Sequence, residues 1–573
     1  MSWSADSVLS RLTSLLLCSV LVAGFAGCAG EPVPDAKWSK APEPGPVGDP
    51  AGRAAAVAAR LSDQDLVGQV LMPFVYGTHA TKVAGPAATA NRKTYGVATP
   101  AELVRRYRLG GLILVRQAGD PTGGTNPTTN VESPEQVRRL TDGLQGAAGS
   151  LPAAQAAGGR LPLLIGTDQE HGVVTRIREG MTLLPTAMAF GAAADPELTE
   201  RAWRMAGTEL AAVGVNVDFA PDADVIGGSG NLVIGSRSYG SAPRQVAEQV
   251  SAVVRGLRGA GVAATLKHFP GHGHTSTDSH EALPRLAYDR DRLRRVDLPP
   301  FQSGIAAGAE LVMSGHLDTR AIDPGNPASF SRKVLVDLLR EKLGFEGVVV
   351  SDGMGMAPAR AWPPGEAAVR AVLAGNDLLL LPPNLAAAQR GLLQAMDSGR
   401  LSRERMVRAV TRILTLKLRL AAHRQPALST VDSPEHRAVA EDVAAGAVTV
   451  LRGRCSGKLV SEMVRVTGGT PEQRVWLTEA LRERGVAVGE TGTQVHLTGY
   501  GDGPDDLAVG AAVTVGMDAP YLLGRAKSAS VLAAYGANRY AMRAVAAVLA
   551  GTARPAGRSP VPVRGLPRTA CSG

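Results

Sequence analysis

Residues 263–280 read A-A-T-L-K-H-F-P-G-H-G-H-T-S-T-D-S-H, an apolar run that passes directly into a polar loop. The run 263–269 is almost continuously apolar up to Lys267 and His268, which is typical of a strand buried on both faces of a parallel sheet. Proline, glycine and small polar residues then predict a loop. The stretch therefore predicts a buried strand that carries polar side chains to its carboxyl end.

The same kind of apolar run recurs elsewhere between residues 70 and 383. Helix-like stretches separate most of the runs, and 196–214 and 243–261 are amphipathic examples. Eight strand–helix units over roughly 360 residues predict an α/β fold of the (β/α)8 TIM-type barrel class, with a doubly wound open sheet as the alternative. The other runs are VLMPFV (70–75), GGLILV (110–115), PLLIGTD (162–168), NVDFAPDADV (216–225), ELVMSGH (310–316), GVVVSDG (347–353) and DLLLLPP (377–383).

Several of these runs end in polar residues. Because the parallel strands of a barrel bring their carboxyl ends to one face, and chemistry gathers at that face, we expect a functional site there. The polar residues at the run ends are Asp168, Asp224, Lys267, His268, His316 and Asp352.

Two further regions follow the eight runs. Residues 384–425 are helical in pattern and basic, and they predict the last helices of the barrel and the start of a connector. A second alternation of strand-like and helix-like segments, from about 437 to 565, predicts a smaller α/β domain that ends in a turn and an edge strand. We place the barrel with its connector at 53–425 and the second domain at 437–573. The strand-like segments of the second domain are 447–453, 459–469, 493–500 and 511–517.

The N-terminus has the pattern of an export signal. An apolar run at 12–27 is short for a membrane span, a basic residue precedes it and small residues end it. It closes as F-A-G-C, which is similar to a bacterial lipobox with phenylalanine in place of the usual aliphatic residue. We expect 1–27 to be a signal peptide and Cys28 to carry lipid on the outer face of the cytoplasmic membrane, with plain secretion as the alternative. The proline-rich segment 28–52 predicts an extended tether.

Cys455 and Cys571 remain once the signal and the lipid site are set aside. Outside the cytoplasm they can form a disulfide across the second domain, and two unpaired thiols are the alternative.

The formal net charge is +9, but no basic block is interleaved with aromatic residues, so nucleic-acid binding is not indicated. A solvated basic surface accounts for the charge, and attraction to an anionic envelope polymer or membrane is the functional alternative.

Four of the ten histidines of the chain lie within 267–280. Their spacing, H-x3-H-x-H-x5-H, does not match a helical zinc motif, and no nearby cysteine or carboxylate set completes a zinc site, so we expect no metal.

Asp278 and His280 are separated by one residue, so their side chains can meet. A carboxylate that accepts from one imidazole nitrogen raises the basicity of the other, which suits general acid–base catalysis; a loop-bracing hydrogen bond is the alternative.

Asp352 lies in V-V-V-S-D-G-M-G-M (348–356). A carboxylate at the end of an apolar strand, followed by glycine, can face a pocket. It could act as a nucleophile, a metal ligand or a helix cap.

Together these motifs resemble glycoside hydrolase family 3. The patterns K-H-F-P-G-H-G-x5-D-S-H (267–280) and S-D-x-x-x-M (351–356) are similar to its β-N-acetylglucosaminidase branch, the branch that carries D-S-H in this loop. The second domain is similar to the family's α/β sandwich domain, but more loosely. Further matching segments are Gly166–Gly172 with Arg176, Val215–Pro221 with Asp224 and Val225, Asn231–Gly240, Ala374–Asp377, Tyr535–Asn538 and Gly557–Val563.

The resemblance implies a TIM-type barrel followed by an α/β sandwich, and a retaining two-step mechanism that needs no cofactor. Asp352 would attack the anomeric carbon. His280, oriented by Asp278, would protonate the departing oxygen and then deprotonate water. The residues that would bind the sugar, with donors and acceptors suited to many hydroxyl groups, are Asp168, Arg176, Arg237, Lys267 and His268.

Four positions bear on how this site would work. Gly271 and Gly273 would let the loop turn and move, so that His280 enters when substrate binds. Gly353 stands where the family often has Asp after the nucleophile. His171 stands where glycine is usual, and its place beside Asp168 in the sequence predicts an effect on affinity or on preference for the leaving group.

The resemblance implies an exported exo-β-N-acetylglucosaminidase, expected to be a monomer. It would remove terminal non-reducing N-acetylglucosamine from peptidoglycan fragments or related envelope glycans. Phosphorolysis at the same site is one alternative, because histidine does not repel phosphate as a carboxylate would. A catalytically inactive glycan-binding lipoprotein is the other, although Asp352, Asp278 and His280 are all present.

Overall fold

The computed structural model describes residues 49–116, 130–159 and 161–571. The predicted signal peptide 1–27 and the predicted lipid site Cys28 lie outside the described residues, as does almost all of the predicted tether 28–52. The last residues of that segment are described, and they begin helix α1 (Pro50–Arg60).

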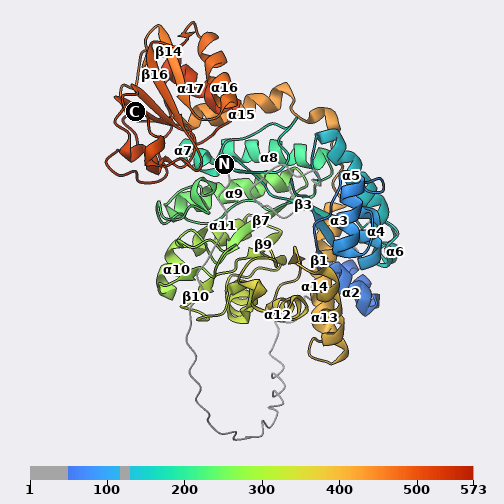
Figure 1. Cartoon of the computed structure of the whole chain (residues 1–573). Coiled ribbons are helices and arrows are strands. Elements are labelled where there is room, and N and C mark those ends of the chain that lie inside the picture. The colour runs from blue at the N-terminus through green and yellow to red at the C-terminus, as the bar shows by residue number, and fades with distance from the viewer. Residues whose placement is uncertain (1–48, 117–129, 160, 572–573) are drawn as a thin grey trace, which may run out of the picture. The chain divides into compact units, whose positions relative to one another are not determined.

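Each of the eight apolar runs contains a strand, and in the described part of the chain these strands form a parallel barrel (Figure 1). Six are paired in the order β11-β9-β7-β6-β3-β2, and β1 pairs with β12. The N–H of Ile113 donates to Pro73 O at 3.1 Å and that of Ser351 donates to Leu378 O at 2.9 Å, which joins the two sets. The predicted TIM-type barrel is confirmed. The strands are β1 (Leu71–Met72), β2 (Gly111–Ile113), β3 (Leu164–Thr167), β6 (Val217–Asp218), β7 (Ala263–Phe269), β9 (Leu311–Ser314), β11 (Val348–Ser351) and β12 (Leu379–Leu380).

The barrel strands are buried on both faces, which explains their continuous apolar pattern. All residues of β3, β7, β9 and β11 are buried. Full burial of a Val, Leu or Ile side chain contributes about 1.5–3 kcal/mol each. The polar residues at the ends of these strands are therefore held on a rigid, well-packed frame.

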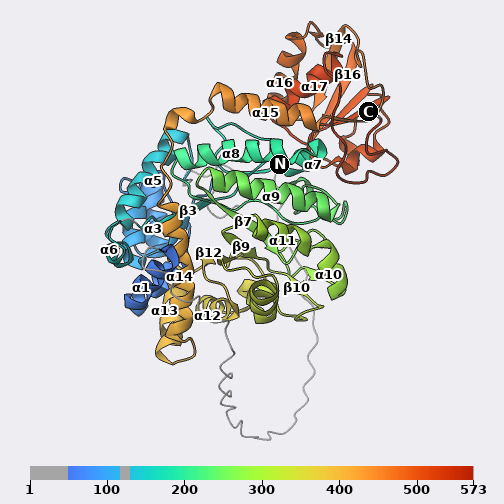
Figure 2. The ribbon, with the colours of Figure 1, turned by 180° about the vertical axis from the view of Figure 1, so that it is seen from behind.

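Helices cover the outside of the barrel. Three of them, α8 (Pro196–Ala212), α9 (Pro243–Gly259) and α11 (Leu298–Ala306), lie side by side in both views (Figures 1 and 2). The first two confirm the helices predicted at 196–214 and 243–261. The remaining helices of this region are α2 (Asp63–Gln69), α3 (Gly85–Tyr95), α4 (Pro100–Tyr107), α5 (Pro134–Ala148), α6 (Pro152–Ala156), α7 (Ala187–Ala193), α10 (Arg290–Val296), Lys333–Lys342, α12 (Pro364–Ala374), α13 (Leu385–Asp397) and α14 (Arg403–Leu420).

Two small strand pairs lie in loops beyond the barrel strands. One joins β4 (Gln169–His171) to β5 (Val174–Thr175), and the other joins β8 (Arg285–Leu286) to β10 (Asp318–Thr319). Both belong to segments that follow the carboxyl ends of barrel strands, where the site is expected.

The C-terminal domain is built on a separate sheet, as predicted. Its described strands are paired in the order β13-β18-β17-β16-β14-β15, with β13 antiparallel to β18 and the other pairs parallel. The short strand β18 was not predicted. The predicted edge strand in the tail is wrong, because Val563 and Leu566 form only an isolated bridge. The elements are α15 (Pro434–Ala447), β13 (Thr449–Arg452), β14 (Met463–Gly468), α16 (Pro471–Arg482), β15 (Ala487–Val488), β16 (Thr493–Thr498), β17 (Val513–Gly516), β18 (Ser530–Ala533) and α17 (Arg539–Leu549).

A disulfide joins Cys455, just after β13, to Cys571, and it closes almost the whole C-terminal sheet into one loop.

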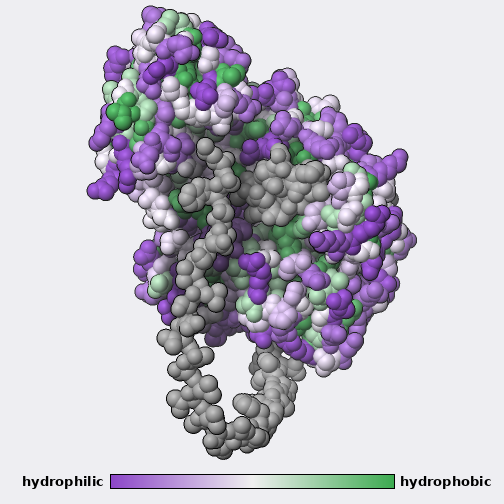
Figure 3. All heavy atoms as spheres, in the orientation of Figure 1, coloured by the Kyte–Doolittle hydropathy of each residue, from purple (hydrophilic) through white to green (hydrophobic). Residues whose placement is uncertain are grey.

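Hydrophilic side chains spread over most of the coloured face in Figure 3. Within residues 49–116, 130–159 and 161–571, none of the helices has both the length and the apolar character that a membrane crossing requires.

Candidate active site

The predicted site residues lie at one end of the barrel. Asp168 directly follows β3, Lys267 and His268 lie near the end of β7, and Asp352 directly follows β11. The N–H of Asp352 donates to Ser314 O at 3.0 Å, which ties its backbone to the end of β9. Because the strands run parallel, these side chains share the carboxyl face of the barrel.

Lys267 is the centre of an ion-pair cluster. Its Nζ lies 3.0 Å from Asp168 Oδ1 and 2.5 Å from Glu170 Oε1, and only 2% of its side chain is exposed. Arg176 Nη2 lies 3.6 Å from Asp168 Oδ2. The Asp168 carboxylate is about one-fifth exposed, so it is the member of this cluster that meets solvent. Three residues predicted to bind sugar are therefore brought together.

Glu170 links this cluster to Arg237. The Arg237 guanidinium donates to both Glu170 oxygens, at 2.7 and 2.9 Å, and its Nη2 lies 3.5 Å from Asp222 Oδ2. Burial alone would raise the pKa of Glu170, but Arg237 and Lys267 outweigh it and hold that pKa well below its usual range. Bidentate, charge-assisted bonds of this kind fix orientation as well as charge. Glu170 thus orients both cations.

A buried carboxyl pair supports His268. The Nδ1 of His268 lies 2.8 Å from Asp224 Oδ2, and burial lowers the pKa of His268 to about 4. Burial and the neighbouring Asp224 raise the pKa of Asp222 well above its usual range, and burial raises that of Asp224 to about 6. The His268 imidazole is therefore neutral near pH 7. Its Nδ1–H donates to Asp224, which leaves Nε2 to accept a hydrogen bond.

The same cluster does not fit a metal ion, although Asp222, Asp224 and His268 place ligand atoms within 4.8 Å of one another. The oxygens of Asp224 already accept from the backbone N–H groups of His268 and His272, at 3.2 and 2.5 Å, and from the imidazole of His268. Arg237 supplies the positive charge beside Asp222. The oxygens of Asp224 are thus occupied by N–H donors, and a guanidinium already balances the charge beside Asp222.

Asp352 has the surroundings of an ionised carboxylate. Burial would raise its pKa, but the imidazoles of His268 and His316 and the N–H of Gly353, which lies 2.7 Å from Oδ1, hold it below its usual value. His280 contributes in the same direction. A carboxylate that stays ionised in a largely buried site can act as a nucleophile.

His316 fixes the turn that follows Asp352. Its Nε2 lies 3.0 Å from Gly353 O, its Nδ1 lies 2.6 Å from Ser329 Oγ, and its ring stacks on Phe330 at 6.0 Å between centroids. Burial lowers the pKa of His316, so its neutral ring donates to the carbonyl and accepts from the serine. His316 therefore orients the loop that carries Asp352.

Asp278 and His280 meet as predicted. Asp278 Oδ1 accepts from the backbone N–H of His280 at 2.8 Å and lies 2.8 Å from its Nδ1. Partial burial would raise the pKa of Asp278, but these two bonds lower it below its usual value. The two side chains are 37% and 46% exposed, so the pair lies at the solvent edge of the site. Such a pair can donate a proton from Nε2 of the imidazole.

The stem of the loop that carries this pair is tightly held. Asn231 Nδ2 donates to His272 O at 2.8 Å, and Gly227 N donates to Gly273 O at 2.8 Å. A Cβ on Gly273 would lie 2.0 Å from Val225 O. Gly273 is therefore required by this close approach of two backbones, and the loop mobility that we expected of it stays a prediction.

Contacts of two further histidines brace the same loop. His274 Nδ1 lies 2.9 Å from Asp297 Oδ1, and Tyr288 donates its hydroxyl to the other oxygen of that carboxylate at 2.5 Å. His272 Nε2 lies 3.2 Å from Ser279 Oγ, which joins the stem to the residue between Asp278 and His280. The His274 side chain is 12% exposed and His272 is 1% exposed, whereas the His280 side chain is 46% exposed, so His280 is the most accessible of the three for proton transfer.

His171 lies in the core beside Trp203. Their rings are 5.5 Å apart in an edge-to-face contact, and Nδ1 accepts from Leu184 N at 3.3 Å. Burial lowers the pKa of His171 to about 3, so the ring is neutral. Its φ of 65° turns the chain at a position where glycine is favoured. The ring packs against Trp203 of α8, so its contacts lie in the core, and the predicted effect on affinity or on preference for the leaving group stays a prediction.

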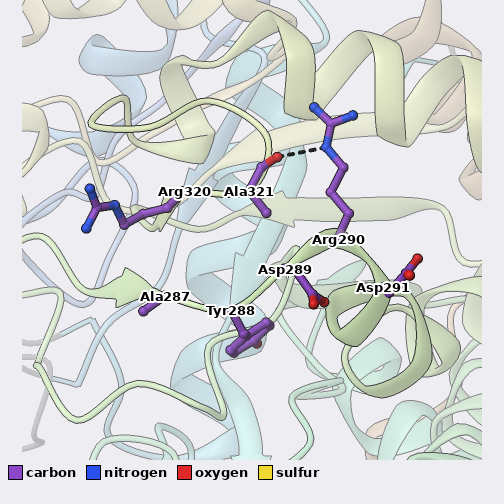
Figure 4. Close-up of a pocket in the computed structure, with 7 residues that line it drawn as sticks. All are labelled: Ala287, Tyr288, Asp289, Arg290, Asp291, Arg320 and Ala321. Carbon is purple, nitrogen blue, oxygen red and sulfur yellow. Dashed lines mark hydrogen bonds between the residues drawn. The ribbon is translucent and has the colours of Figure 1, made fainter.

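A pocket of about 600 Å³ is lined by residues 287–291 and 320–321 (Figure 4). Its charged side chains point in different directions, and Arg290 Nε is bonded to Ala321 O at 2.7 Å. Ligand sites place a few polar groups so that they converge on one point. The pocket has no such arrangement and is not the catalytic centre. The lining residues are Ala287, Tyr288, Asp289, Arg290, Asp291, Arg320 and Ala321.

Glu170 and Asp222 were not predicted as site residues, and Asp224 and His316 were noticed only as polar strand ends. The signal for Glu170 was its place in T-D-Q-E directly after a strand. Its function depends on contacts with Arg237 and Lys267, which are distant in sequence and become visible only in the fold.

Comparisons with known proteins agree with this site. The model of the glycosyl hydrolase family 3 N-terminal domain matches residues 67–416. A relative named β-hexosaminidase A, from Pseudoalteromonas piscicida, is 33% identical over 429 residues, which cover 70% of this chain and 69% of the relative. A β-hexosaminidase from Alkalilimnicola ehrlichii is 39% identical over 349 residues, which cover 59% of this chain and 88% of the relative.

A solved structure extends the likeness to the second domain. It is a glycoside hydrolase family 3 β-N-acetylglucosaminidase from Paenibacillus, with a TM-score of 0.75 and 32% identity, and the match covers 88% of this chain and 99% of that one. The resemblance seen in the sequence motifs is thereby confirmed. The chain belongs to glycosyl hydrolase family 3 and is a glycosidase.

Proposed function

We propose that the protein is a retaining exo-β-N-acetylglucosaminidase. The observation that carries this proposal is the bonded pair of Asp278 and His280 at the rim of the site that holds Asp352. Most retaining glycosidases use two carboxyl groups. Here we assign the second role to the His280 imidazole, which is near enough to Asp352 to help lower its pKa. Similarity to proteins named β-hexosaminidase and β-N-acetylglucosaminidase supports the sugar specificity.

The first step forms a covalent intermediate. A carboxylate oxygen of Asp352 attacks the anomeric carbon while the bond from that carbon to the leaving oxygen breaks. The protonated imidazole of His280 gives its Nε2 proton to the leaving oxygen, and Asp278 stabilises the imidazolium before transfer through the bond to Nδ1. The products of this step are the free aglycone alcohol, a glycosyl ester on Asp352 and a neutral His280.

The second step reverses these roles. The neutral His280 takes a proton from water, and the water oxygen attacks the anomeric carbon and displaces Asp352. Two inversions give the sugar in its original β configuration. The ion-pair cluster around Glu170 offers hydrogen-bonding groups to the sugar hydroxyls. Asp168, which is exposed to solvent, is the acceptor, and Lys267 and Arg237 are the donors.

We also propose that the natural substrate is a peptidoglycan fragment or a related envelope glycan. The predicted export signal 1–27 and the predicted lipid site Cys28 support this assignment, because they would hold the enzyme at the outer face of the membrane. Cys28→Ala tests the anchor: the variant should move from the membrane fraction to the soluble fraction.

Hydrolysis of p-nitrophenyl β-N-acetylglucosaminide and of the matching glucoside tests the activity. The wild type should prefer the N-acetylated substrate, and His280→Ala should lose on the order of 10²–10⁴-fold in rate, the usual contribution of general acid–base catalysis. A preference for the glucoside would overturn the sugar assignment. In phosphate buffer, free N-acetylglucosamine as the product supports hydrolysis, whereas its 1-phosphate would identify a phosphorylase.

A further inference from the structure

The segment 219–240, between β6 and α9, connects the active site to the C-terminal domain; we call it the bridging loop. On its barrel side it carries Asp224, which accepts from His268 and His272, and Asn231, which holds the stem of the catalytic loop. It also carries Arg237, which binds Glu170 through two bonds. One loop thus supports both the sugar-binding cluster and the loop with His280.

The other side of the bridging loop packs on the C-terminal domain. Ile226 and Ile234 are 1% exposed and belong to an apolar cluster with residues of that domain. Ser241, directly after the loop, donates its N–H to Pro560 O at 3.1 Å. A Cβ on Gly240 would lie 2.9 Å from atoms of Pro560, so the two chains are in close contact. The partners in the cluster include Leu523, Val531, Ala533, Tyr535, Val561 and Val563.

One polar contact lies at the centre of this apolar interface. The hydroxyl of Ser236 donates to Asp518, which lies two residues before the short helix Pro520–Arg525 of the C-terminal domain. Ser236 is 2% exposed, and burial raises the pKa of Asp518 while the bond from Ser236 opposes that rise. A buried hydrogen bond to a carboxyl group is costly to break, because its partners find no water. Ser236 immediately precedes Arg237 in the turn Gly235–Arg237.

We propose that Asp518 is a positioning residue for sugar binding: the C-terminal domain fixes the turn Gly235–Arg237 through Asp518 and so aligns Arg237 with Glu170 and Lys267. The bidentate Arg237–Glu170 geometry requires a fixed approach of the guanidinium. A binding group must be held within roughly 0.5 Å of its working position by its supporting contacts. The inference rests on the proposed sugar-binding function of this cluster, and it gives the C-terminal domain a role in binding without a catalytic group of its own.

Four variants of the full chain test this role. Asp518→Ala and Ser236→Ala should each raise KM for p-nitrophenyl β-N-acetylglucosaminide, and the inhibition constant of free N-acetylglucosamine, by roughly 10- to 100-fold, since a displacement on the order of 1 Å has effects of that size. The value of kcat should change less. Asp518→Asn keeps an oxygen acceptor for Ser236 and should restore most of the binding. The double alanine variant should be no worse than either single one, because both remove the same bond.

Asn538→Ala is a matched control at the same interface. Asn538 Nδ2 donates to Leu183 O at 2.9 Å, away from the Gly235–Arg237 turn. This variant should lower the unfolding temperature and leave KM unchanged. The proposal is overturned if Asp518→Ala and Ser236→Ala behave like this control. If Asp518→Ala does not fold, Ser236→Ala alone decides the question. If the wild type prefers the glucoside, the proposed function fails, and the same comparison made with that glucoside still decides the role of Asp518.

Discussion

Glu170→Gln is the change that tests the ion-pair cluster most sharply. The substitution keeps size and shape but removes the charge that Arg237 and Lys267 share. The Lys267 side chain is 2% exposed and that of Arg237 is 12% exposed, so neither cation can fully regain water without local opening. The variant therefore leaves two buried cations beside a neutral amide.

The expected cost follows from this burial. Removal of one partner from a buried ion pair typically lowers the free energy of unfolding by about 3–5 kcal/mol. The pKa of Glu170 is lower in the folded protein than in the unfolded chain, where it is about 4.3. The contribution of Glu170 is therefore fully present above pH ~4.3 and is lost as the pH falls below that value. The difference in the free energy of unfolding between wild type and variant should be large at pH 7 and should become smaller below pH ~4.

Urea unfolding followed by tryptophan fluorescence at pH 7 and at more acidic pH measures this gap. Glu404→Gln is the matched control, because the side chain of Glu404 is 81% exposed and pairs with Arg408 on the same helix. The control should change the free energy of unfolding by about 0.5 kcal/mol or less. A loss below about 1 kcal/mol for Glu170→Gln, or a gap that widens in acid, would refute the reasoning.

Three further outcomes are expected. Asp377→Asn should lower the free energy of unfolding by about 3–5 kcal/mol in urea titrations, because it removes the negative charge that pairs with Arg340, Arg405 and Arg412, the first two of which are at most 8% exposed; a loss under ~1 kcal/mol would contradict this. The Nζ of Lys417 is bonded to Gln69, and burial lowers the pKa of Lys417 to about 7. Between pH ~7 and pH ~10 the unfolded chain therefore binds more protons than the folded one, so the free energy of unfolding of the wild type should rise with pH. Lys417→Met should lack that rise, and equal slopes of the free energy of unfolding against pH in the two proteins would refute the assignment. Reduction of Cys455–Cys571 should destabilise the C-terminal domain by about 2–5 kcal/mol; calorimetry with and without reductant measures the change, and identical transitions would argue against a structural disulfide.

The barrel was predictable because its physical cause leaves a direct trace in the sequence. Strands buried on both faces must be continuously apolar, and all eight runs of this kind contain barrel strands. The site was predictable in part for the same reason, since a polar residue at the end of such a run stands out. Strand β18 escaped notice because S-V-L-A is short and stands among small residues that are equally common in helices and loops.

What the sequence left out depends on the third dimension. His171 is close to Asp168 in the sequence, but the backbone turns at His171 and directs its ring to Trp203. The mobility expected of Gly273 stays a prediction, and the fold adds that its lack of a Cβ admits Val225 O. The role of Glu170 depends on Lys267, near the end of β7, and on Arg237, in the turn Gly235–Arg237. Sequence spacing reports local geometry, and it does not report which distant segments meet.

The central claim is that Asp352 is the nucleophile of a retaining mechanism. A fluorinated N-acetylglucosaminide with a good leaving group slows the second step and lets the glycosyl-enzyme accumulate. Mass spectrometry of the digested protein should then find one sugar per chain, bound to the peptide that contains Asp352, and no labelled peptide in Asp352→Ala. A sugar bound to another residue, or full turnover by Asp352→Ala, would contradict the account.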